Sequence, residues 1–122
     1  MTSTHAQRKA LGDYGERLAA AHLVEKGLVV LDRNWRCSAG EIDIVAADGN
    51  TVVVCEVKTR SSCRFGTPME AITAQKAARL HRLGWMWVKH HSVRCAELRV
   101  DVVAILAPQR GAAAVEHLVG VA

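Results

Sequence analysis

Gly40-Glu41-Ile42-Asp43 and, after a turn, Glu56-Val57-Lys58-Thr59-Arg60 are the stretches that decide the fold. Each belongs to a strongly apolar, β-branched run of the kind that forms strands. Asp48-Gly49-Asn50 lies between the two runs and is a turn signal, so together they predict a β-hairpin. Charged side chains inside such strands are unfavourable unless they are paired or bind an ion. The hairpin therefore predicts a functional site as well as part of a sheet.

The turn decides which charged residues of this hairpin meet. If Gly49-Asn50 forms a two-residue loop, Asp43 lies directly across from Glu56. If Asp48-Gly49 is the loop, Glu56 becomes the diagonal neighbour of Asp43. Both registers place the two carboxylates on one face, with Cβ atoms about 5–8 Å apart. A three-residue loop without a bulge would put them on opposite faces.

The charged residues of the hairpin suit phosphodiester hydrolysis. Lys58 shares the face of Glu56, because strand side chains alternate. Mg²⁺ is held by hard oxygen ligands, usually one or two carboxylates with water and substrate phosphate, and a nearby lysine offsets developing negative charge. The acids Asp43 and Glu56 against the single Lys58 leave excess negative charge, which a cation would compensate. The alternative is a buried acid–acid–lysine network retained for structure.

In this pattern of Asp43 followed by Glu56-x-Lys58, the chain resembles the PD-(D/E)xK nuclease superfamily. Within its Holliday-junction-resolvase-like branch, the chain is most similar to the YraN-like family. The resemblance extends from Gly12 to Leu80. It is carried by Gly15-Glu16, Gly27, Asn34, Arg36, Gly40-Glu41-Ile42-Asp43, Glu56-Val57-Lys58-Thr59-Arg60, Gly66 and Lys76. One departure is Ile42, which precedes the acid where the superfamily has proline, as is common in the resolvase-like branch.

The resemblance implies a Mg²⁺- or Mn²⁺-dependent endonuclease that hydrolyses phosphodiester bonds in DNA, including branched or structured DNA. It implies that Asp43, Glu56 and Lys58 are catalytic and that the two acids are metal ligands. A non-catalytic nucleic-acid-binding or accessory module with the same fold is the alternative. We favour the enzyme because a degenerate relative would usually have lost one of the three residues.

Glu16 is the candidate site residue of the first helix. It lies on a helical stripe with Ala19, Ala20 and Leu23, so it faces either the edge of the core or a site. In resolvase-like nucleases a first-helix glutamate joins the metal cluster, and the resemblance gives Glu16 that catalytic and metal-binding role. The alternative is an ion pair with a neighbour such as Arg17.

Three basic residues are candidates for binding nucleic acid. Arg60 and Arg64 flank the acids in a basic loop, where they either contact phosphates or are simply solvated. Lys76 falls in an apolar stripe of the second helix. It either reaches the site or lays its aliphatic stem along the apolar face of the helix.

Length and charge set the outer limits. The chain has 122 residues and a formal charge of +4, which suits one nuclease-like domain over 1–122 and a polyanionic partner. We expect residues 1–8 to be mobile. The sequence has neither an apolar run of membrane-span length nor a signal-peptide apolar region, so we expect no membrane association and a cytoplasmic location. The four cysteines lack zinc-ribbon spacing, and we expect free thiols.

Periodicity predicts the order αβββαβ(β) and hence an α/β fold. The resemblance implies a restriction-endonuclease-like core, with a mixed β-sheet flanked by helices. A polar, basic loop is expected over 59–66, and a capping box at 67–70 is expected to start the second helix, bent at Gly84. The expected elements are helices 6–26 and 67–89 and strands 29–35, 41–47, 51–58, 97–106 and 114–119.

Trp85, Met86 and Trp87 are consecutive large apolar residues in the second helix. Three such residues in a row cover more than one helix face, so at least one is expected at the surface or in an interface. The alternatives are a homodimer contact, which we favour because resolvase-like nucleases often pair, and core packing with one surface tryptophan.

Overall fold

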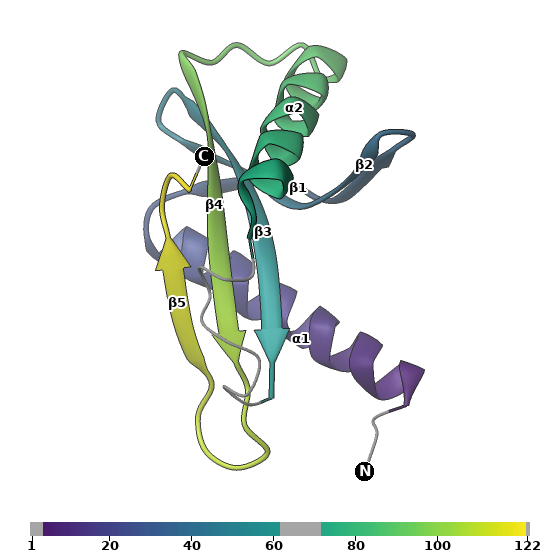
Figure 1. The fold of residues 1–122 in the computed structure, drawn as a ribbon. Coiled ribbons are helices and arrows are strands. Elements are labelled where there is room, and N and C mark those ends of the chain that lie inside the picture. The colour runs from purple at the N-terminus through teal and green to yellow at the C-terminus, as the bar shows by residue number, and fades with distance from the viewer. Residues whose placement is uncertain (1–3, 62–71, 122) are drawn as a thin grey trace.

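The computed structural model describes residues 4–61 and 72–121, and in these ranges the chain forms two helices and five strands. Their order confirms the predicted α/β class, with the last short segment as a fifth strand (Figure 1). The elements are α1 (His5–Glu25), β1 (Val29–Cys37), β2 (Gly40–Asp48), β3 (Thr51–Arg60), α2 (Ala74–His90), β4 (Glu97–Leu106) and β5 (Ala114–Leu118).

The strands form one mixed sheet in the order β1-β2-β3-β4-β5. Only β3 and β4 run parallel; the other neighbours are antiparallel. Asp48 pairs with Thr51, so Gly49-Asn50 is the two-residue loop and the first predicted register is the observed one. Gly49 has a φ of 58°, a left-handed conformation that glycine adopts without strain. The predicted basic loop starts late, because Thr59 and Arg60 still belong to β3.

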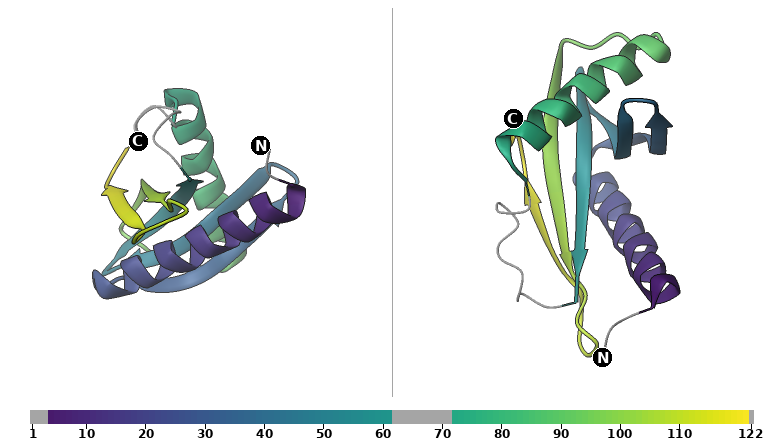
Figure 2. Two further views of the ribbon diagram at one scale, coloured as in Figure 1. Left: turned by 90° about the horizontal axis from the view of Figure 1, so that it is seen from below. Right: turned by 45° about the vertical axis from the view of Figure 1, so that its right-hand side comes forward.

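The two helices cover opposite faces of the sheet (Figures 1 and 2). Each helix buries an apolar stripe against alternate residues of the strands, as the two-residue period of a strand requires. The cluster under α1 includes Ala19, Leu23, Val53, Cys55 and Val103. The cluster under α2 includes Leu80, Leu83, Trp87, Val54 and Val100.

Helix α1 begins one residue earlier than predicted, because Thr4 caps it. The Thr4 hydroxyl accepts from the backbone N–H of Gln7 at 3.1 Å, and the Gln7 side chain accepts from the Thr4 N–H at 2.7 Å. The helix ends where Gly27 takes a φ of 92°, as predicted. Residues 5–8 are thus helical, and residues 1–3 lie outside the described part of the chain.

Helix α2 starts later than the sequence predicts. The capping box expected at 67–70 lies outside the described residues, but Ile72 and Thr73 are not helical, so a continuous helix from Thr67 is wrong. Instead Thr73 is the cap, and its hydroxyl accepts from the Lys76 N–H at 3.1 Å. The helix runs unbroken through Gly84. Within the described ranges, no helix is long and apolar enough to cross a membrane.

Candidate functional site

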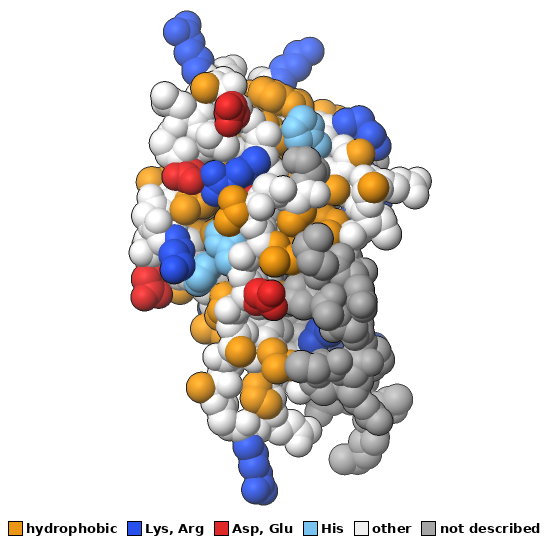
Figure 3. Space-filling view, turned by 60° about the vertical axis from the view of Figure 1, so that its left-hand side comes forward, with side chains coloured by type: hydrophobic (Ala, Val, Ile, Leu, Met, Phe, Trp, Pro, Cys, Tyr) orange, Lys and Arg blue, Asp and Glu red, His pale blue; other side chains and the backbone are white. Residues whose placement is uncertain are grey.

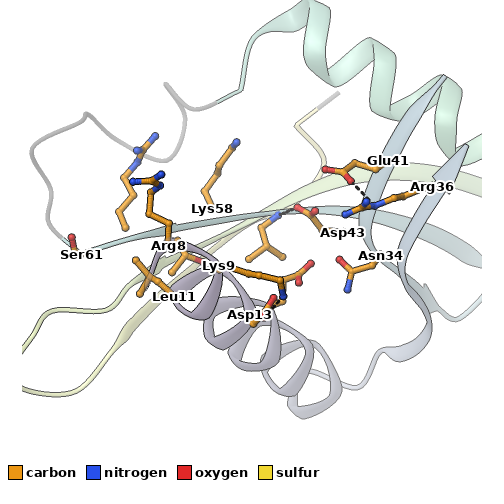
Figure 4. Close-up of a pocket in the computed structure, with 15 residues that line it drawn as sticks. Arg8, Lys9, Leu11, Asp13, Asn34, Arg36, Glu41, Asp43, Lys58 and Ser61 are labelled. Carbon is orange, nitrogen blue, oxygen red and sulfur yellow. Dashed lines mark hydrogen bonds and ion pairs between the residues drawn. The ribbon is translucent and has the colours of Figure 1, made fainter. Parts of the chain in front are cut away.

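A cleft of about 920 Å³ opens between helix α1 and strands β1 to β3 (Figure 4). Acidic and basic side chains from four elements line it. The acids are Asp13, Glu16, Glu41 and Asp43, and the bases are Arg8, Lys9, Arg36, Lys58 and Arg60. Carboxylates thus stand beside cations in one concave surface, the combination that phosphate chemistry with a divalent ion would use.

Gly15 brings helix α1 against β3 and so forms one wall of the cleft. A Cβ at this position would collide with the side chain of Thr59. Only glycine permits this distance between helix and strand. The close approach places the next residue, Glu16, at the cleft.

Asp43 stands where strand β2 separates from β3. The β2–β3 pairs end at Ile44 and Cys55, while the β1–β2 hairpin continues and turns away from the sheet (Figure 1). Asp43 Oδ2 takes over as acceptor for the next backbone N–H, that of Val57, at 2.8 Å. The carboxylate is therefore held rigidly at the opening between the strands.

The pKa of Asp43 is raised to about 7, from an ordinary value of 3.8. Burial is the largest cause and the negative charge of Glu56 is the second, while the Val57 N–H acts to lower it. The two carboxyl groups therefore lie close together, and the charge of one opposes the charge of the other. A divalent cation would relieve this repulsion between two neighbouring carboxylates, so the pair fits Mg²⁺ or Mn²⁺.

Glu56 lies on the other side of Asp43 and reaches toward helix α2. Its side chain is 13% exposed, and its Oε2 lies 3.3 Å from Lys76 Nζ. Lys58 Nζ is 4.0 Å from the other oxygen, Oε1. Two lysines therefore face the acid pair. The expectation that Asp43 and Glu56 would have only one lysine to balance their negative charge was wrong. Lys76 is brought in by the docking of α2.

The two lysines influence each other. The pKa of Lys58 is lowered, first by burial and then by its contact with Lys76. Burial acts in the same direction on Lys76, but the contact with Lys58 and the charge of Glu56 outweigh it and raise the Lys76 pKa. Lys58 is thus the amine that releases its proton more readily, and it is also the one that lines the cleft.

Glu16 lines the cleft, and it forms no ion pair with Arg17. Burial raises the pKa of Glu16, while Arg33 and a hydrogen bond from Asn34 act to lower it. Its charge in turn helps to raise the pKa of Asp43. Even so, no three His, Cys, Asp or Glu side chains in the described ranges come close enough to hold a metal ion together.

Asn34 is a site residue that the analysis of the sequence named only as part of the family pattern. The β1–β2 pairs flank it on both sides, which places it across from Asp43. Its φ of 53° is left-handed inside a strand, a conformation that asparagine tolerates better than most residues. Its sequence neighbours Asp32, Arg33 and Arg36 are charged, so apart from the family pattern no local signal marked it.

The remaining residues named in the sequence analysis lie in different places. Arg60 lies at the cleft, and Arg64 lies outside the described residues. Glu41 lies on the exposed rim, with its carboxylate 3.1 Å from Arg36 Nε. Cys37, Cys55 and Cys95 are free thiols, as expected; Cys63 is not among the described residues.

Another acid, Asp101 on β4, lies away from the cleft. It is fully buried, and donors surround it. Arg99 Nε lies at 3.1 Å, His117 Nε2 at 2.8 Å and the Gly120 N–H at 2.9 Å. His117 also contacts His22 of α1 at 3.2 Å. This network ties the C-terminal strand β5 to the sheet.

Comparison with known proteins places the chain among relatives of the same length. The model of "Uncharacterised protein family UPF0102" matches residues 15–105. The chain belongs to this family. It is 55% identical to UPF0102 proteins of Nocardioides sp. and Kineococcus radiotolerans, over 99% and 96% of its length and 99% and 98% of theirs. It is 45% identical to the Acidothermus cellulolyticus protein, over 98% of both chains. The predicted YraN-like membership is confirmed.

Proposed function

We propose that this UPF0102 protein is a metal-dependent DNA endonuclease of the PD-(D/E)xK type. The observation that carries the proposal is the pair Asp43–Glu56, two neighbouring carboxyl groups beside a cleft, where burial and the charge of Glu56 raise the pKa of Asp43. Perturbed carboxyl groups of this kind are typical of catalytic sites. The cations around the cleft support a polyanionic substrate, and branched or structured DNA is the proposed class.

Asp43 and Glu56 would hold Mg²⁺ or Mn²⁺, with Glu16 acting from the opposite wall. When bound, such an ion lowers the pKa of a coordinated water and offsets charge on phosphate oxygens. The role of Lys58 is to present its amine to the scissile phosphate, where a positive charge stabilises the transition state. The Val57 N–H keeps the Asp43 carboxylate oriented, and Asn34 does the same for Glu16.

The second candidate is a non-catalytic module that binds nucleic acid. Two observations favour it: Lys58 and Lys76 both face Glu56, and no three-ligand cluster forms within residues 4–61 and 72–121. Two ammonium groups balance two carboxylates without an ion. In this reading the charge network stabilises the hairpin, and DNA binds without being cut.

Calorimetric titration with Mg²⁺ and Mn²⁺ separates the two candidates. The parent chain should bind an ion, and Asp43→Asn should abolish binding while circular dichroism shows an unchanged fold. A cleavage screen follows, over linear, flapped, forked and four-way DNA with either ion. Ion binding with cleavage by the parent alone supports the endonuclease. DNA binding with neither ion binding nor cleavage leaves the non-catalytic module.

A further inference from the structure

Helix α2 has only one sign of charge. Over its 17 residues it carries Lys76, Arg79, Arg82 and Lys89, and it contains neither aspartate nor glutamate. Surface helices usually mix both signs, because pairs three or four residues apart then stabilise the helix. A helix that omits every acid gives up that stabilisation, which suggests that its cations face a ligand.

The cations flank two exposed apolar side chains on the outer face of α2. Trp85 and Met86 are each 43% exposed, whereas Trp87 is buried. Arg82 precedes Trp85 by three residues and Lys89 follows it by four, so all of them share one helical stripe. We call this stripe of Arg79, Arg82, Trp85, Met86 and Lys89 the outer α2 stripe. It combines cations with a flat aromatic ring, as single-strand-binding surfaces do.

The cations of the outer α2 stripe have no acidic partners in the described part of the chain. Lys76, on the inner side, is paired with Glu56, but no salt bridge there involves Arg79, Arg82 or Lys89. Figure 3 shows one face of the molecule, on which both acidic and basic side chains occur. The outer α2 stripe is therefore a local region of uncompensated positive charge.

This stripe starts at the edge of the cleft. The Arg79 guanidinium packs over Gly40, where an added Cβ would lie 2.7 Å from Arg79 Nη2. Gly40 is followed by Glu41, which lines the cleft and pairs with Arg36. A polyanion in the cleft would thus reach Arg79, the first cation of the outer α2 stripe, by crossing the β1–β2 turn.

We infer that the outer α2 stripe binds an unpaired strand of the nucleic acid whose backbone enters the cleft. Arg79, Arg82 and Lys89 contact successive phosphates, and an unstacked base lies on the Trp85 ring. A base in a duplex is already stacked and cannot use this ring, so the substrate carries a single-stranded arm. This inference rests on the proposed function only for what occupies the cleft.

Two other occupants fit the surface less well. A symmetric dimer through this face would set the cations of one copy against the same cations of the other, with no acid between them. A membrane surface requires a broad apolar face, and the apolar face of α2 is buried in the sheet by Leu80, Leu83 and Trp87. Only Trp85 and Met86 remain outside, which suits one base.

The test measures binding of fluorescein-labelled oligothymidylate and of a blunt duplex in EDTA, so that neither ion binding nor cleavage is involved. Arg82→Gln/Lys89→Gln should lower the slope of log affinity against log salt by about 1.4 on the single strand, about 0.7 per lost contact. The matched control, Lys26→Gln/Arg110→Gln, removes two exposed charges elsewhere and should keep the parent slope.

Trp85→Ala should weaken single-strand binding about tenfold, as expected for loss of one stacked base. It should affect the duplex little, and Trp85→Phe should retain most of the affinity. The inference is overturned if the α2 variants bind the single strand like the parent. It is equally overturned if Trp85→Ala abolishes a dimer seen by ultracentrifugation, or a vesicle affinity, while single-strand binding is unchanged. These binding assays contain no metal, so their result does not bear on the endonuclease proposal. Loss of cleavage in Asp43→Asn would support that proposal whether or not the outer α2 stripe binds a single strand.

Discussion

Two aspartates on the same sheet, the fully buried Asp101 and the half-buried Asp43, meet opposite environments. Asp101 is surrounded by donors: Arg99, His117 and the Gly120 N–H. Asp43 has one backbone donor, Val57, and its next neighbours are acids, which together with burial raise its pKa to about 7. Burial is costly for both, but only Asp101 is fully compensated within the protein.

The difference separates a structural acid from a candidate functional one. A carboxylate with all its donors stabilises the fold and has no capacity for a ligand. A carboxylate left beside other acids destabilises the fold until a proton or cation arrives, and such local destabilisation is characteristic of active sites. Changes around Asp43 should therefore alter catalysis more than folding, and changes around Asp101 the reverse.

The largest expected effect is on the Asp43 side. Lys58→Ala should retain ion and DNA binding and lower the cleavage rate by about 10²–10³, the usual cost of losing a positioned electrostatic group. Lys58→Arg should rescue poorly, because a planar fork replaces a compact charge. Single-turnover cleavage of a labelled branched duplex with Mn²⁺ measures this, with Lys26→Ala, an exposed lysine outside the cleft, as the control. Equal rates for parent and Lys58→Ala would remove Lys58 from catalysis.

On the Asp101 side the effect should be on stability. Asp101→Asn leaves the partly buried partners Arg99 and His117 without their anion, and should cost about 3 kcal/mol of unfolding free energy. That corresponds to a fall in Tm of about 10 °C in thermal denaturation. Asp48→Asn removes the exposed partner of Arg99 and should cost less than about 1 kcal/mol. If Asp101→Asn had the same Tm as the parent, Asp101 would not be a structural acid, and the contrast with Asp43 would be wrong.

Divalent ions should stabilise only one of the two regions. Saturating Mg²⁺ should raise the Tm of the parent, by about 2.7 kcal/mol in unfolding free energy at a hundredfold excess over Kd. The shift should vanish in Asp43→Asn and persist in Asp48→Asn, whose acid lies outside the cleft. An equal shift in all three proteins would point to nonspecific ion effects and count against the site.

The smallest effect is a pH-dependent gain in stability on removing the Asp43 charge. The folded-state pKa of Asp43, about 7, lies above its ordinary value of 3.8, so its contribution is present below pH 4 and lost as pH rises through 7. Without metal, Asp43→Asn should match the stability of the parent near pH 4 and exceed it above pH 7, because the variant has no carboxylate to ionise. Denaturation in EDTA across this range tests it, and a constant difference would contradict the raised pKa.

Much of the site was predictable because its parts are close in sequence. The loop Gly49-Asn50 set the hairpin register, and that register carried Asp43 toward Glu56. Glu16 was found through the family resemblance, and the close contact of Gly15 with Thr59 now gives its position a physical cause. Asn34 needed its backbone conformation to be seen, since an asparagine in a strand does not by itself reveal a left-handed φ.

The sequence by itself determined the class of fold, the hairpin and the candidate acids, because turn chemistry and strand alternation act over a few residues. Only the tertiary structure decided that Lys76 meets Glu56 and that Asp101 is surrounded by Arg99 and His117. Two of these contacts, Glu56–Lys76 and Asp101–His117, join different elements of the fold. They depend on how α2 and β5 dock, and docking follows from burying whole apolar faces, which no local pattern records.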